Sequence, residues 1–210
     1  MTDTMTHHIA GAILAGGHAR RLGGMAKGTI RADGQLSLIE RLVVHMLRCG
    51  VEEIVVVAND ERPYAHLGCA IVPDQRADAG PLAGIEAALA HFSGRYEAVL
   101  CLPCDLPALS AQEMSALLSA YAAGGGPVVF AETEHAARHP LCAVVRTDRL
   151  ADISAALERG TRAVGAVWSD LGGTAVPFDN PESFTNINSP GDLDAWFAKQ
   201  GCRGERDGSD

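Results

Sequence analysis

Three charged side chains in this sequence have the types and surroundings that phosphate chemistry requires. Arg21 and Lys27 lie in the glycine-rich stretch LAGGHARRLGGMAKG (residues 14–28), and Asp105 lies further along the chain. Glycines let backbone N–H groups approach an anion closely, and full positive charges can contact separate phosphates of a triphosphate. A carboxylate can hold the Mg²⁺ ion that accompanies such a triphosphate. Together these residues predict a nucleotide-binding site.

The spacing within residues 14–28 differs from the two most familiar nucleotide loops. The stretch contains no GxGxxG pattern, so it is not the dinucleotide-binding fingerprint. It does not fit the GxxxxGK-S/T loop either, because Gly28 rather than Ser or Thr follows Lys27. A glycine-rich turn with solvated cations is the simpler alternative. The position of the stretch directly after an apolar run favours a nucleotide loop.

Apolar runs rich in Val and Ile recur along the chain and predict strands. Continuous apolar runs are typical of strands that are covered on both faces, as in parallel sheets. The predicted strands cover residues 9–14, 53–58, 69–72, 96–102, 127–131 and 141–145.

Amphipathic stretches between these runs predict helices over residues 38–47, 81–92 and 110–122. Ser110 with Glu113, and Ser189 with Asp192, have the spacing of a capping box, so a further helix is expected after Ser189. Alternating strands and helices predict an α/β fold. We expect a single Rossmann-like three-layer domain with a mostly parallel central sheet.

The predicted strands place the charged residues in one layer. Open α/β sheets bind ligands outside the carboxyl ends of their strands. Residues 14–28 begin where the first strand ends, Asp74 follows the third, and Asp105 follows the fourth. Each aspartate could instead be ordinary turn chemistry. Their common edge favours one site.

Length and charge limit the classes of protein to consider. The chain has 210 residues, a formal net charge of −9 and a hydrophobic fraction of 47%. This length suits one domain, since roughly 100–200 residues per domain is usual. The negative charge argues against nucleic-acid or membrane binding, because both surfaces are anionic. No apolar run reaches the roughly 18 residues of a spanning helix, and the polar start MTDTMTHH predicts a cytoplasmic protein.

Cys101 and Cys104 form a CxxC pair, which offers a different chemistry. In a cytosolic α/β protein such a pair can be a redox site. Redox pairs favour a helix N-terminus, where the thiol pKa falls, whereas this pair ends a predicted strand beside Asp105. The sequence has no second CxxC to complete a zinc site. We therefore expect packed, reduced thiols here.

Five stretches in order along the chain resemble the molybdenum cofactor guanylyltransferases. The first matches the LAGG-x3-R-x-GG-x2-KG signature of nucleotidyltransferases with the glycosyltransferase-A-like fold. The stretches are LAGGHARRLGGMAKG (14–28), DQRADAGPLAG (74–84), CLPCDLP (101–107), RHPL (138–141) and TNINSPGDL (185–193). The resemblance covers almost the whole chain, which suggests a nucleotidyltransferase domain over residues 9–200 between flexible ends at 1–8 and 201–210.

The resemblance implies an enzyme that transfers GMP from GTP to molybdopterin and releases pyrophosphate. Its product would be the guanine dinucleotide form of the molybdenum cofactor. The implied cofactor is Mg²⁺, held by Asp105. The implied partners are GTP, molybdopterin and proteins that deliver the cofactor or mature molybdoenzymes, with no nucleic acid and no membrane.

The resemblance also assigns individual residues. As catalytic groups it implies Arg21, Lys27 and Asp105. As GTP contacts it implies Leu14, Ala15, Gly16, Gly17, Lys27, Asn59, Asp74 and Asp105. As contacts of the acceptor it implies His139, Asn186 and Asn188.

One position departs from the guanylyltransferase pattern and keeps an alternative open. Those enzymes commonly carry a further asparagine where this chain has Val57, two residues before Asn59. A cytidylyltransferase for the same cofactor is the nearest alternative, although such relatives more often read LAAG than LAGG. A sugar-nucleotide pyrophosphorylase would commonly need a further domain. A non-catalytic nucleotide-binding protein would not need Arg21, Lys27 and Asp105 together.

Overall fold

The predicted apolar runs form a seven-stranded sheet in the order β3-β2-β1-β4-β6-β5-β7. The computed structural model describes residues 8–16, 26–31, 35–76 and 78–204, with side chains up to residue 198. Only β6 runs antiparallel to its neighbours, so the sheet is mostly parallel, as predicted. The strands are β1 (Ile9–Leu14), β2 (Ile54–Val57), β3 (Ala70–Val72), β4 (Ala98–Pro103), β5 (Val128–Thr133), β6 (Ala137–Arg146) and β7 (Thr174–Phe178).

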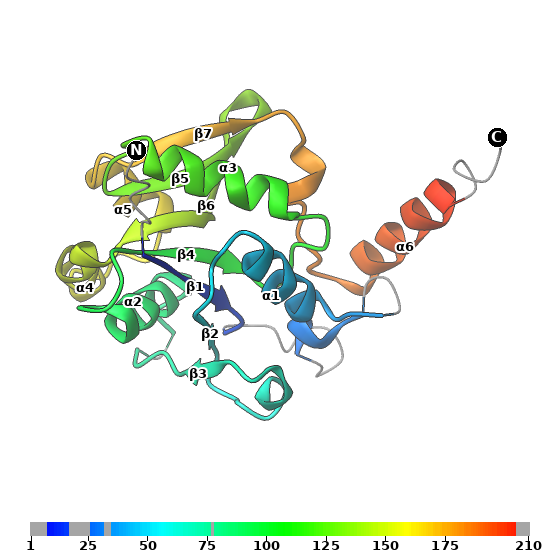
Figure 1. Cartoon of the computed structure of the whole chain (residues 1–210), viewed down its shortest axis with the longest axis horizontal. Helices are drawn as coiled ribbons and strands as arrows, with labels where there is room; N and C mark the ends of the chain where they lie inside the picture. Colours follow the sequence, from blue (N-terminus) through cyan, green and yellow to red (C-terminus); the bar gives the residue numbers. More distant parts are fainter. Residues whose placement is uncertain (1–7, 17–25, 32–34, 77, 205–210) are drawn as a thin grey trace, which may run out of the picture.

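Helices cover both faces of this sheet and complete a three-layer domain (Figure 1). The α-helices are α1 (Leu38–Arg48), α2 (Pro81–Phe92), α3 (Ala111–Ala122), α4 (Leu150–Glu158), α5 (Val164–Asp170) and α6 (Pro190–Gly204). Helices α2, α4 and α5 pack on one face of the sheet around a core that includes Trp168. Helices α1 and α3 pack on the other face. Helix α6 extends away from the sheet, at the right of Figure 1.

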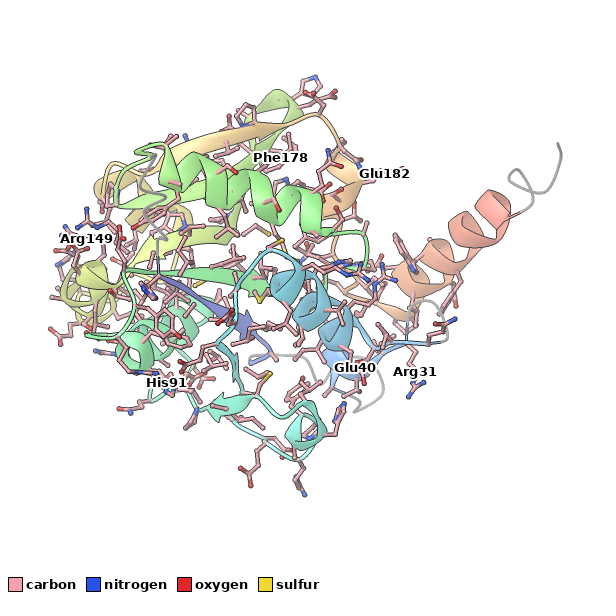
Figure 2. All side chains as sticks on the ribbon, viewed as in Figure 1. Arg31, Glu40, His91, Arg149, Phe178 and Glu182 are labelled. Carbon is pink, nitrogen blue, oxygen red and sulfur yellow. The ribbon has the colours of Figure 1, made fainter. Side chains whose placement is uncertain are left out.

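Strand register brings several strand ends to one edge of the sheet. Leu14, the last residue of β1, pairs with Val57 at the end of β2 and with Pro103 at the end of β4. Strands β2 and β4 therefore flank β1 at the point where the strand order reverses, which is where doubly wound sheets bind ligands. The edge opposite to this one carries the 3₁₀ helix η5 (Thr147–Arg149). In Figure 2, Arg149 lies at the far side of the molecule from Glu40.

Local sequence signals explain where the helices begin. Both predicted capping boxes form, at the N-termini of α3 and α6. A third box, made by Ser37 and Glu40, begins α1 and was not predicted. Each box satisfies backbone N–H groups that the first helical turn leaves free. These caps fix the start of the helices that leave the ligand edge.

Some elements differ from the sequence prediction. Strand β7 and helices α4 and α5 were not predicted. Residues 141–145 were expected as a separate short strand, but β6 begins at Ala137 and forms a hairpin with β5. The domain boundary predicted at residue 200 stays a prediction, although α6 continues to Gly204. No helix among the described residues is long and apolar enough to span a membrane.

The β5–β6 hairpin turns through two residues with left-handed backbone, His135 (φ 58°) and Ala136 (φ 57°). Left-handed φ costs an L-residue roughly 1–2 kcal/mol, whereas glycine adopts it freely. We therefore expect Ala136→Gly to raise the free energy of unfolding by about 1 kcal/mol, measured by urea titration.

Ala137→Gly is the matched control for this substitution. Ala137 is the next residue, is also exposed, and has an ordinary φ of −72°. At such a position glycine only adds freedom to the unfolded chain, so stability should fall by roughly 0.5–1 kcal/mol. Equal effects of the two substitutions would contradict strain at Ala136.

Candidate active site

An ion pair between Lys27 and Asp105 lies at the ligand edge. Lys27 begins the 3₁₀ helix η2 (Lys27–Thr29), and Asp105 lies two residues after β4. The Lys27 Nζ atom is 3.3 Å from the Asp105 Oδ2 atom, and the two side chains are 12% and 14% exposed. Partial burial strengthens the attraction relative to a surface pair. The structure therefore brings together the two groups predicted for phosphate and metal chemistry.

Two asparagines from the far end of the chain complete this cluster. Asn186 Nδ2 donates to Asp105 Oδ1 at 3.0 Å, and Lys27 Nζ donates to Asn188 Oδ1 at 2.6 Å. The Ile187 N–H between them donates to the Asp105 carbonyl oxygen at 2.9 Å. Each carboxylate oxygen of Asp105 thus accepts one hydrogen bond from a side chain. The sequence assigned both asparagines to the acceptor; here they contact Lys27 and Asp105, and the acceptor role stays a prediction.

The capping box of α6 holds this asparagine segment in place. The Asn188 and Ser189 N–H groups each donate to Asp192 Oδ2 at 2.8 Å. These backbone hydrogen bonds lower the pKa of the Asp192 carboxyl, and the charge of Lys27 adds to the effect. The position of Asn188 therefore depends on the first turn of α6.

A close contact beneath η2 fixes the backbone next to Lys27. Gly28 is buried against the ring of Tyr64, and a Cβ atom at Gly28 would lie 3.1 Å from Tyr64 Cε1. Burial raises the pKa of Tyr64 far above its ordinary value, so its hydroxyl stays protonated. Only glycine lets the backbone beside Lys27 pack this closely on the ring.

Predicted nucleotide contacts lie along the neighbouring strand ends. Gly16 is exposed, and a Cβ atom there would lie 3.6 Å from Asp74 Oδ2. Asn59 Oδ1 accepts a hydrogen bond from the Asp74 N–H at 3.1 Å. Gly16, Asn59 and Asp74 therefore form a second group at the same edge, between β1, β2 and β3. Leu14 and Ala15 are buried at the end of β1, so their side chains are not exposed at this edge.

The amino end of α2 follows this group in the chain. Its N-cap, Gly80, has φ 70° and offers no side chain to cap the helix, and Pro81 occupies the first turn. The first N–H groups of a helix without a side-chain cap can bind an anion such as phosphate.

His139 belongs to a different cluster on β6. Its Nε2 atom is 2.9 Å from Thr133 Oγ1, and its ring stacks on Phe184 with 4.7 Å between centroids. Burial lowers the pKa of His139, so the ring is uncharged at neutral pH. Within the described residues, His139 has no hydrogen bond to the Lys27–Asp105 cluster. Its predicted role with the acceptor stays a prediction.

Two predicted residues, Gly17 and Arg21, lie outside the described residues. Arg21 was assigned a catalytic role and Gly17 a nucleotide contact. Both assignments stay predictions.

The alternative redox chemistry of the CxxC pair does not fit the structure. Cys101 packs in the core beneath α2 and α4, whereas Cys104 packs in the core on the opposite face of the sheet. Burial raises the pKa of each thiol to about 12. A reactive thiol needs a low pKa and access to its partner. The two thiols are therefore packing residues, as the sequence predicted.

The cluster around Asp105 has the ligands that a hard divalent ion accepts. Mg²⁺ in nucleotide enzymes uses one or two carboxylates and takes its remaining oxygens from phosphates and water. Asp105 provides one partly exposed carboxylate at the strand end. The described residues contain no group of three or more His, Cys, Asp or Glu side chains that could hold a metal alone. The site thus suits an ion that arrives with a phosphate ligand.

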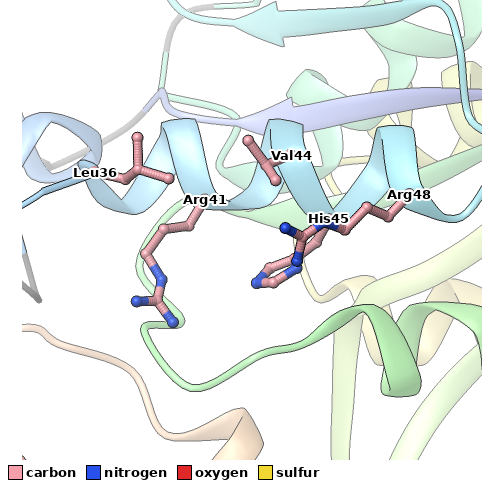
Figure 3. Close-up of a pocket in the computed structure, with 5 residues that line it drawn as sticks. All are labelled: Leu36, Arg41, Val44, His45 and Arg48. Carbon is pink, nitrogen blue, oxygen red and sulfur yellow. The ribbon is translucent and has the colours of Figure 1, made fainter.

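A small pocket on the outer face of α1 contains none of the predicted site residues (Figure 3). It is lined by Leu36, Arg41, Val44, His45 and Arg48. Burial, followed by the charges of Arg41 and Arg48, lowers the pKa of His45. The pocket is therefore a separate feature, distinct from the strand-end site.

The residues that hold Lys27 and Asp105 were not predicted from the sequence. The sequence feature that could have identified them is the N-x-N spacing of Asn186 and Asn188, which places both side chains on one side of an extended segment. Tyr64 beneath Gly28 was also missed, since its loop carries no motif.

Comparison with protein families gives a match over most of the chain. Residues 11–171 match the pattern described as the MobA-like NTP transferase domain. A molybdenum cofactor guanylyltransferase from Burkholderia vietnamiensis is 36% identical over 202 residues, which cover 90% of this chain and 95% of the relative. A protein of the same name from Shewanella sp. strain MR-4 is 31% identical over 189 residues, covering 89% and 93%.

Solved structures share the fold. Molybdopterin-guanine dinucleotide biosynthesis protein A from Archaeoglobus fulgidus superposes with a TM-score of 0.70 at 23% identity, covering 91% of this chain and 98% of that one. A CMP:2-keto-3-deoxy-manno-octonic acid synthetase complexed with CTP gives a TM-score of 0.72 at 14% identity, covering 93% and 99%. Likeness at these identities establishes the nucleotidyltransferase architecture alone.

Proposed function

Because this chain belongs to the MobA-like NTP transferase family, we propose that its strand-end site transfers GMP from GTP to molybdopterin. The product is the guanine dinucleotide form of the molybdenum cofactor, and pyrophosphate is released. The relatives named molybdenum cofactor guanylyltransferase, which match along almost their full length, support this activity. The chain is a nucleotidyltransferase of molybdenum cofactor biosynthesis.

The observation that carries the proposal is the pairing of Lys27 with Asp105 at the strand end. A terminal phosphate oxygen of the acceptor attacks the α-phosphorus of GTP, and the bond to the β-phosphate oxygen breaks. Such transfers need little covalent chemistry from the protein, so positioning and charge stabilisation do most of the work. Lys27 contributes a positive charge to the phosphates, and Asn188 orients its ammonium group.

Enzymes of this family use a divalent metal ion, and we propose Mg²⁺ held by Asp105. When bound, the ion would neutralise charge on the transferring phosphate and on the pyrophosphate. Asn186 donates to one carboxylate oxygen and so orients Asp105. This arrangement resembles the outer hydrogen bonds that fix ligands in other metal sites.

We assign the nucleoside to the group formed by Gly16, Asn59 and Asp74. These residues offer an open backbone position, an amide and a carboxylate at the ends of adjacent strands. Guanine has donor and acceptor groups on one edge that such a set can pair with. Val57, the position that departs from the guanylyltransferase pattern, is buried, and its Cγ1 atom lies 3.4 Å from the Cβ position of Gly84. Its side chain packs against the first turn of α2.

We assign the acceptor to the side of the site that leads to His139. An uncharged ring stacked on Phe184 suits contact with a neutral pterin. Proteins that deliver molybdopterin or receive the product are proposed as partners.

The choice of nucleotide gives a direct test. We expect transfer with GTP to be at least about tenfold more efficient than with CTP, which corresponds to roughly 1.4 kcal/mol. A site that pairs with the groups of one base leaves its own buried groups unpaired with another. The measurement is pyrophosphate release with each of the four nucleoside triphosphates, with and without molybdopterin.

Two results would change the assignment. Equal use of GTP and CTP, or a preference for CTP, would indicate the cytidylyltransferase alternative. Pyrophosphate release that does not depend on molybdopterin would indicate a different acceptor.

A further inference from the structure

A salt bridge anchors the segment that carries Asp74. Residues 74–76 follow β3, and Arg76 reaches from them to Glu86 in the second turn of α2. Arg76 Nε donates to Glu86 Oε2 at 2.7 Å, and Arg76 Nη2 donates to Glu86 Oε1 at 2.9 Å. This two-pronged geometry fixes the direction of the guanidinium as well as its distance. The segment is therefore tied to a rigid helix two residues beyond Asp74.

The environment of the pair makes it stronger than an ordinary surface ion pair. The Glu86 side chain is 14% exposed and that of Arg76 is 33% exposed. Burial by itself would raise the pKa of Glu86, but the hydrogen bonds from Arg76 and from Ser154 lower it on balance. Glu158 of α4 lies 3.8 Å from Arg76 Nη2 as a second, weaker partner. Glu86 is thus ionised, and removing Arg76 would leave its charge partly buried.

The other end of the segment is fixed from β2. Asn59 accepts the hydrogen bond from the Asp74 N–H at 3.1 Å. Asp74 is therefore held from Asn59 on one side and, through Arg76, from α2 on the other. Its Oδ2 atom lies next to Gly16, at the edge assigned above to the nucleoside.

We propose that Arg76 and Glu86 are positioning residues of the nucleoside site, which set how strongly it distinguishes one base from another. This inference rests on the proposed function, because it assumes that Gly16, Asn59 and Asp74 contact the nucleoside. Neither Arg76 nor Glu86 touches the substrate. They act through Asp74, since selection among bases requires hydrogen-bonding groups held to within a fraction of an ångström.

The test measures nucleotide binding, with the full chain and Mg²⁺, by isothermal titration calorimetry with GTP and with CTP. We expect Arg76→Met, which keeps the length of the side chain, to weaken GTP binding by roughly three- to tenfold. CTP binding should change less, so the GTP-to-CTP ratio of affinities should fall. Glu86→Gln should give the same change, and the double variant should be no worse than either single variant, because the two residues act as one unit.

Two further variants separate positioning from general stability. The exchange Arg76→Glu with Glu86→Arg restores an ion pair and should recover a large part of the ratio. Arg149→Met is the matched control, since Arg149 pairs with Asp148 and Asp152 at the opposite edge of the sheet. It should leave the ratio unchanged even if the thermal unfolding temperature falls.

The outcomes distinguish this inference from the proposed function. A wild-type chain that prefers CTP would contradict the proposed function, and the inference is then judged on the CTP-to-GTP ratio. A wild-type chain that binds both nucleotides equally would overturn the inference, because the site would then distinguish neither base. If Arg76→Met kept the GTP-to-CTP ratio of affinities and lost only folding stability, the inference would be overturned. A ratio that falls equally in Arg149→Met would overturn it too.

Discussion

Asp105→Asn is expected to reduce metal-dependent transfer by roughly a thousandfold. The substitution removes the negative charge that would hold the metal ion. It also disturbs the cluster, because Asp105 accepts hydrogen bonds on both oxygens, from Asn186 and from Lys27. An asparagine side chain has one acceptor and one donor end. Whichever way it turns, its NH₂ group faces one of those donors.

The measurement for Asp105→Asn is the transfer rate at several concentrations of Mg²⁺, together with binding of Mn²⁺ followed by electron paramagnetic resonance. Asp148→Asn is the control, because Asp148 also pairs with arginines but lies at the opposite edge of the sheet. It should keep normal transfer and normal metal binding. Full activity of Asp105→Asn at ordinary Mg²⁺ concentrations would show that another group holds the metal.

Lys27→Ala is expected to slow transfer by roughly a hundredfold, which corresponds to about 2.7 kcal/mol. The substitution removes the positive charge that pairs with Asp105. The charge on the phosphates then loses the stabilisation that Lys27 would give. The fold should persist, because Lys27 belongs to a short 3₁₀ helix at the edge of the core. The effect should appear in kcat, measured by steady-state kinetics, and in the affinity for GTP, measured by direct titration.

Arg62→Ala provides the comparison for Lys27→Ala. Arg62 and Asp60 both lie beyond the end of β2 and form an ion pair, but the Arg62 side chain is 87% exposed. Loss of such an exposed charge should leave transfer and stability almost unchanged. If Lys27→Ala behaved like Arg62→Ala, the phosphate contact would have to come from elsewhere in residues 14–28.

The sequence allowed the fold class to be predicted because several of its strands are continuous apolar runs. The runs at residues 9–14 and 53–58 correspond closely to β1 and β2, which are buried along most of their length. Strand β7 escaped notice because it is a half-exposed edge strand that contains Pro177, so its pattern is weak. The antiparallel direction of β6 was not predicted either, since an apolar run carries no information on strand direction.

The grouping of the candidate site residues was predictable to a similar degree. Because open α/β sheets bind ligands at the carboxyl ends of their strands, these residues were expected at one edge. The structure places Lys27 with Asp105 and Asp74 beside Gly16 at that edge. The sequence did not show which groups surround Lys27 and Asp105, because Asn186 and Asn188 lie in a segment without regular structure. Only tertiary contacts determine the path of such a segment. The cytoplasmic location stays a prediction.

The distance along the chain between members of the cluster has a consequence for synthesis of the protein. Lys27 and Asn188 are separated by 161 positions, and Asp105 and Asn186 by 81. All seven strands are complete at Phe178, before either asparagine has been made. A chain that ends shortly after Phe178 therefore contains every strand of the sheet but lacks both asparagines of the cluster. We expect such a truncated product to lose the hydrogen bonds that orient Lys27 and Asp105.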